Sequence, residues 1–137
     1  MESNVEQNKE INSLATVRAM VQRDNDRKEE ILKGRGVPIL AAQDLEDTTK
    51  MTNTYKKAIE RNAEVMDFVM DIKNDILKIK LVKARLDRST ALYVSQAQQF
   101  DDFIKILNSI LSIMKDEVSK MDRIVRFYER NYSTYSF

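Results

Sequence analysis

The chain has 137 residues, with 23 Lys and Arg against 22 Asp and Glu, 42% hydrophobic residues, two glycines and one proline. It contains no His and no Cys, which excludes imidazole catalysis, thiol nucleophiles, disulfides and His or Cys metal ligands. Both glycines stand together at Gly34 and Gly36, so neither a P-loop nor a dinucleotide-binding turn can form. We therefore expect a single all-α unit over residues 1–137 that is not an enzyme and uses no cofactor or metal.

No stretch approaches 18 uncharged apolar residues, so we expect no transmembrane helix. The N-terminal sequence MESNVEQNKE is polar and lacks the apolar core of a general secretory signal. These features are typical of a soluble protein and leave its location unknown.

The first predicted element is a helix over residues 4–33. Ile11, Leu14, Val17 and Val21 give it an apolar face at helical spacing, whereas the charged stretch 23–27 is predicted to be solvated. Gly34 is expected to end the helix in the left-handed conformation. A linker follows over residues 34–43, where the sequence GRGVP is the strongest break in the chain.

The longest element is predicted over residues 44–131, which contain neither Gly nor Pro, with Asp44 or Asp47 as its N-cap. A seven-residue hydrophobic register continues from Met51 to Tyr135. Because separate helices need not keep the same phase, it favours one very long helix in a coiled coil or helical bundle. The polar group 87–90 leaves a long helical hairpin as the alternative.

The seam of this register is the predicted surface for self-association or for a partner's helices, because apolar side chains at this spacing must be buried. Asn62 and Lys83 are polar seam sites that either fix its register and oligomeric state or face solvent where the seam is open. The members that carry the prediction are Val65, Val69, Ile72, Ile76, Ile79, Leu86, Tyr93, Phe100, Ile104, Leu107, Leu111, Met114, Val118, Met121 and Val125.

A second apolar stripe lies beside the seam in the C-terminal half. Its members are Phe103, Ile106, Ile110, Ile113, Ile124 and Phe127. Together the two widen the apolar face to roughly 160°, more than a two-stranded coil buries. We therefore expect an oligomer or a stable complex with another protein. Six methionines lie in helical segments and some are candidates for adaptable contacts, although methionine is also a common core residue: Met20, Met51, Met66, Met70, Met114 and Met121.

Two local features are candidate binding sites. A basic patch within residues 73–88 is formed by Lys73, Lys78, Lys80, Lys83, Arg85 and Arg88. It lacks the aromatic residues that stack on bases, so a solvated helix surface is the stronger interpretation and nucleic-acid binding is not expected. A candidate docking tail at the aromatic end of the chain (132–137 and the preceding turn) contains Tyr128, Tyr132, Tyr135 and Phe137.

The leading functional hypothesis is a structural or assembly subunit that oligomerises or bundles through long amphipathic helices, as in a virion, an appendage or a secretion apparatus. The alternative is a compact helical adaptor, chaperone or inhibitor that binds a partner helix. The third is a nucleic-acid binder that works through segment 73–88. A fold turned back at 87–90 would favour the adaptor.

Overall fold

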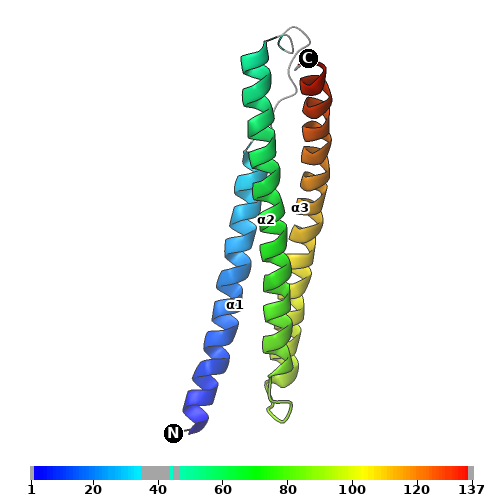
Figure 1. Cartoon of the computed structure of the whole chain (residues 1–137). Coiled ribbons are helices and arrows are strands. Elements are labelled where there is room, and N and C mark those ends of the chain that lie inside the picture. Colours follow the sequence, from blue (N-terminus) through cyan, green and yellow to red (C-terminus); the bar gives the residue numbers. More distant parts are fainter. Residues whose placement is uncertain (1, 35–43, 45–46, 136–137) are drawn as a thin grey trace.

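The computed structural model describes residues 2–34, 44 and 47–135, and among these the side chains of 13–34, 44 and 47–130. The described residues form three helices, α1 (Glu2–Lys33), α2 (Thr48–Ala84) and α3 (Tyr93–Tyr135), and contain no strand. The helices run up, down and up beside one another (Figure 1). The all-helical expectation is confirmed, and the packing is that of a helical bundle.

The run predicted as one very long helix is divided, and the chain adopts the hairpin alternative. Residues 85–92 reverse its direction between α2 and α3 (Figure 1). Asp87 organises the turn: its Oδ1 accepts from the amide of Ser89 at 2.9 Å, and its carbonyl accepts from the hydroxyl of Thr90 at 3.0 Å. Leu86 lies within this turn and Tyr93 begins α3, so the members of the predicted seam are divided between two helices and their connection.

The C-terminal end of α1 and the N-terminal end of α2 are capped by side chains. Asp47 is the N-cap of α2, where its carboxylate accepts from the amides of Thr49 and Lys50 at 3.0 and 3.2 Å. At the end of α1, the expected left-handed glycine is absent, because Gly34 has a negative φ. Arg61 of α2 instead donates to the carbonyls of Ile31 and Gly34, so a guanidinium satisfies the helix terminus. Most of the predicted linker, residues 35–43, lies outside the described part.

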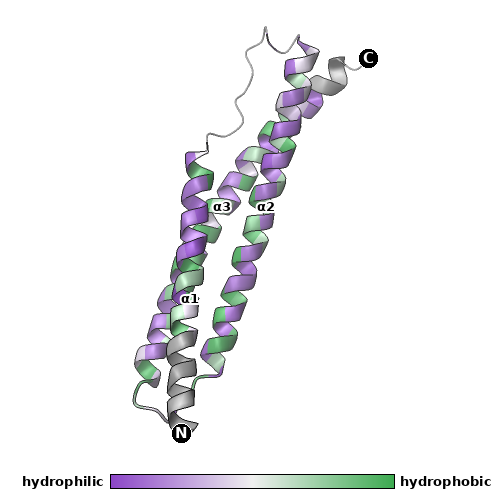
Figure 2. Ribbon diagram, turned by 90° about the vertical axis from the view of Figure 1, so that its left-hand side faces the viewer, coloured by the Kyte–Doolittle hydropathy of each residue, from purple (hydrophilic) through white to green (hydrophobic). Residues whose placement is uncertain are grey.

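Apolar and polar residues alternate along the helices (Figure 2), and the buried ones gather in two clusters. The larger cluster belongs to the three-helix part of the molecule, where α1 packs on α2 and α3, and it includes Val21, Phe68 and Leu107. The smaller cluster belongs to the two-helix end, where α2 and α3 continue past α1 (Figure 1), and it includes Met51 and Tyr128.

Candidate functional site

The predicted seam lies within this chain, between α2 and α3. Val65, Ile72 and Ile79 of α2 are completely buried, as is Leu107 of α3. The other members are buried or half-buried: Val69, Ile76, Leu86, Tyr93, Phe100, Ile104, Leu111, Met114, Val118, Met121 and Val125. The seam thus builds the core of the bundle and leaves little of its surface for a second chain.

The second apolar stripe, on α3, is only partly covered. Ile110 is buried, whereas Ile106 and Ile113 remain 44% and 39% exposed. The half-buried members are Phe103, Ile124 and Phe127. This stripe therefore contributes to the core and leaves two isoleucines, one heptad apart, on the surface.

A more continuous apolar surface lies on the outer face of α2, opposite the core. We call it the outer stripe; it is formed by Ile59, Met66, Met70, Leu77 and Leu81, which are 42–56% exposed. Their spacing of seven, four, seven and four residues keeps them within one narrow band of a helix with 3.6 residues per turn. The band is about 33 Å long, at a rise of about 1.5 Å per residue. Sequence reasoning did not identify this stripe, because the same helix also carries the stronger seam; Met66 and Met70 were named only among six helical methionines.

Shallow grooves border the outer stripe on both sides. Between α2 and α3, Met66 and Met70 line a groove with Val69 and Val118. Between α1 and α2, Leu81 lines a second groove, whose other apolar walls are Val17, Met20 and Val82. The exposed stripe is therefore continuous with apolar surface at its middle and at its C-terminal end.

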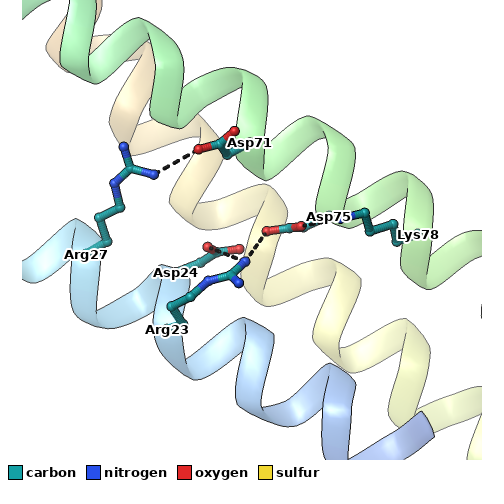
Figure 3. Close-up of polar contacts among 6 residues, drawn as sticks. All are labelled: Arg23, Asp24, Arg27, Asp71, Asp75 and Lys78. Atoms are coloured by element: carbon teal, nitrogen blue, oxygen red, sulfur yellow. Dashed lines mark hydrogen bonds and ion pairs between the residues drawn. The ribbon is translucent and has the colours of Figure 1, made fainter.

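A polar cluster joins α1 to α2 (Figure 3). Arg23 reaches from α1 between two carboxylates, with its Nη2 3.0 Å from Asp75 Oδ2 and 3.5 Å from Asp24 Oδ1. Both aspartates are nearly inaccessible, at 2% and 3% exposure. The stretch 23–27 was predicted to be solvated, and that prediction is wrong for Asp24. The neighbouring charged residues Arg23 and Asp26 are exposed, so the composition of this stretch gave no sign that Asp24 is buried.

A second arginine strengthens the same contact. Arg27 Nη1 lies 2.9 Å from Asp71 Oδ2, and its guanidinium sits 4.5 Å from the centre of the Phe68 ring. On the other side, Lys78 Nζ is 3.9 Å from Asp75 Oδ1 (Figure 3). The cluster thus places acids and bases in alternation, which offsets part of the cost of burying charge.

Burial raises the pKa of Asp24 to about 7, and the adjacent Asp75 carboxylate acts in the same direction, whereas Arg23 opposes the shift. The Oδ2 atom of Asp24 is buried and has no hydrogen-bond partner among the described residues. A proton on Asp24 would relieve both the desolvation and the repulsion between the carboxylates. Within the described part of the chain no group of three or more carboxylates converges as a metal site requires. The contacts that this cluster makes are ion pairs between α1 and α2.

The candidate basic patch does not form one surface. Lys78 is paired with Asp75, and Lys83 Nζ lies 2.7 Å from Asp101 of α3. The six residues line three different grooves: Lys80, Lys83 and Arg88 the first, Lys78 and Arg85 the second, and Lys73 the third. Two of the six charges are thus engaged within the chain.

The candidate docking tail is in part a core element. Tyr128 is completely buried in the two-helix end, and its ring meets Phe127 edge-on at 5.3 Å between centroids. The backbone of α3 continues as helix through Tyr135, so no separate tail begins at residue 132. The side chains of Tyr132 and Tyr135, and all of Phe137, lie outside the described residues.

No helix in the described residues has the length and apolar content required to cross a membrane. Comparison of the chain with protein-family models, with curated proteins and with solved structures gave no match.

Proposed function

We propose that this protein is a non-enzymatic helical subunit that acts by assembling with other protein chains. The observation that carries the proposal is the outer stripe, which leaves five large apolar side chains about half exposed after the bundle has buried its seam. Scattered apolar residues on a surface need no explanation, but a continuous row marks a protein contact. A second helix laid along α2 would bury the whole row at once.

The composition supports the same proposal. No His or Cys is present, and the buried aspartate pair is engaged with Arg23 in holding two helices together. The grooves that border the stripe are shallow, and their apolar walls include methionines, whose flexible side chains adapt to a partner's surface. Lysines and hydroxyl side chains complete both linings.

Light scattering coupled to size-exclusion chromatography, together with small-angle X-ray scattering, tests the proposal. A mass of two or more chains, or one that rises with concentration, is the expected result. Met70→Glu should reduce the mass to that of one chain, because a charge placed in the stripe cannot be buried without cost. Ser112→Glu, an added charge on the exposed outer face of α3, is the matched control and should assemble normally. A monomer at every concentration would contradict self-assembly.

The hairpin favours one second candidate, a compact adaptor that binds a partner's amphipathic helix. Because the seam is folded back within the chain, a stable monomer is compatible with the bundle. The groove between α1 and α2, lined by Val17, Met20, Leu81 and Val82, would then receive the helix. A monomeric chain whose amide signals at these four residues shift with an added amphipathic helical peptide would favour the adaptor over the assembly subunit.

A further inference from the structure

Charges are segregated along the part of α2 that carries the outer stripe, whereas the first turns of the helix, before the stripe, carry Lys50, Lys56 and Lys57. Residues 60–71 contain four acidic residues against one arginine, a net charge of −3. Residues 73–85 contain five basic residues against Asp75, a net charge of +4. The outer stripe spans both segments, with Met70 at its midpoint. A neighbouring α2 that runs in the same direction would place these like-charged segments together, whereas one that runs in the opposite direction places each acidic segment beside a basic segment.

Two charged residues flank the stripe on the same side. Glu60 and Lys78 are 18 residues apart, which is five turns of an α-helix, so both project from α2 in the same direction. Both are exposed, although Lys78 also approaches Asp75 of its own helix at 3.9 Å. They lie at nearly equal distances from Met70, one on each side of it along the helix.

We propose that a second copy of this chain docks on the outer stripe, α2 against α2 and antiparallel, about a two-fold axis beside Met70. This inference rests on the proposed function and adds the partner, the surface and the direction.

The proposed axis brings Ile59 opposite Leu81 of the second copy, a pair of equal size, and the small Ala63 opposite its Leu77. Glu60 comes beside Lys78 of the second copy, and the two-fold symmetry makes this pair twice. Asp71, on the same side near the axis, is already paired with Arg27.

Charge exchange tests the direction. The purified chain is compared with Glu60→Lys, Lys78→Glu and the double variant by sedimentation equilibrium at low salt. Each single change should weaken the dimer about tenfold, because like charges then meet twice, and the double change should restore it to within about threefold. In a parallel dimer Glu60 and Lys78 would lie about 27 Å apart along the helix, so the double variant would be no better than the singles.

Cysteine cross-linking gives a second, independent test, since the natural chain contains no Cys. Met70→Cys should form a disulfide-linked dimer on oxidation, because it faces itself at the axis. Ile59→Cys should not cross-link alone but should do so when mixed with Leu81→Cys. Self-cross-linking of Ile59→Cys would indicate a parallel dimer and overturn the inference. Circular dichroism confirms that each variant retains its helices.

The outcomes separate this inference from the proposed function. A chain that assembles normally with Met70→Glu, or whose double charge variant is not restored, overturns the antiparallel contact while assembly itself stands. A wild-type chain that stays monomeric up to millimolar concentration overturns both.

Discussion

The three-helix part and the two-helix end of this bundle are built from the same two helices but are enclosed differently. In the three-helix part α1 covers the seam between α2 and α3, and Phe68 is completely buried among residues of the larger cluster. In the two-helix end large side chains such as Met51 and Tyr128 must close the core alone. The comparison teaches that α1, although it contributes few core residues, determines where charged side chains are buried: Asp24 and Asp75 lie in the part of the bundle that α1 covers.

The change from one part to the other occurs beside Arg61 and Asn62. Arg61 holds the last carbonyls of α1, and the side-chain Oδ1 of Asn62 is buried with no hydrogen-bond partner among the described residues. Asn62 was predicted to fix the register of a seam between chains. The structure places Asn62 at the level where α1 ends, between the two apolar clusters.

The largest expected effect is the loss of Phe68. Phe68→Ala should lower the free energy of unfolding by about 3–5 kcal/mol, because it leaves a cavity and removes the ring beneath Arg27. Met121→Ala in the two-helix end should cost less, about 2–3 kcal/mol, since two helices can close up more readily than three. Urea denaturation measures both. An equal or larger loss from Met121→Ala would contradict the difference between the two parts.

Next in size is the pH dependence contributed by Asp24. Its pKa is about 7 in the folded chain and about 3.9 when unfolded, so between these values only the folded chain keeps the proton. The stability it contributes is fully present below about pH 4 and is lost as the pH rises through about 7. The slope is at most about 1.4 kcal/mol per pH unit.

Asp24→Asn should remove this slope and make the chain more stable than wild type at pH 8, because the amide carries no charge into the buried site. Urea denaturation at pH 5, 6, 7 and 8 measures the effect. Asp26→Asn, an exposed change on the same helix, is the matched control and should keep the wild-type slope. An unchanged slope in Asp24→Asn would show that the aspartate titrates normally.

A smaller effect is expected at the boundary between the two parts. Arg61→Met should cost about 1–2 kcal/mol, because the carbonyls of Ile31 and Gly34 lose a charged donor. Hydrogen exchange should quicken at the amides of the last turn of α1 and change little in α3. Lys57→Met, an exposed change one turn earlier on α2, is the control. Uniformly faster exchange in all three helices would contradict a local role.

The smallest effect concerns the ion pair near the hairpin. Lys83 and Asp101 are 35% and 41% exposed, so Lys83→Met should change the free energy of unfolding by less than about 1 kcal/mol. The difference from wild type should shrink further in 0.5 M salt, because screening weakens an exposed pair. A loss of several kcal/mol that is insensitive to salt would show that the pair is buried and structural.

Much of the fold could be predicted from the pattern of residues. Scarce glycine and proline indicated helices, and Asp47 was named as a possible cap. The turn at 87–90 was identified only as an alternative, because the heptad phase across it argued for a continuous helix. That argument was misleading, because each helix of a hairpin needs an apolar stripe of the same period.

The candidate sites were less accessible to prediction. Burial of Asp24 depends on Asp75, 51 residues away, and on the position of Arg23 between them, so no local pattern reveals it. The outer stripe had a sequence signal, its spacing of seven and four residues, but α2 carries two apolar faces. Sequence periodicity alone does not tell which of them meets the core.

The sequence by itself determined the helical class, the absence of imidazole and thiol chemistry, and the apolar periodicity that makes the helices amphipathic. These follow from local backbone preference and from which side chains exist. Only the tertiary structure decided that the seam closes on itself, that Arg61 ends α1, that a buried aspartate pair joins α1 to α2, and that the outer stripe faces outward. Each of these depends on which helix faces collect around a common core, and that choice is made by packing among residues distant in the chain.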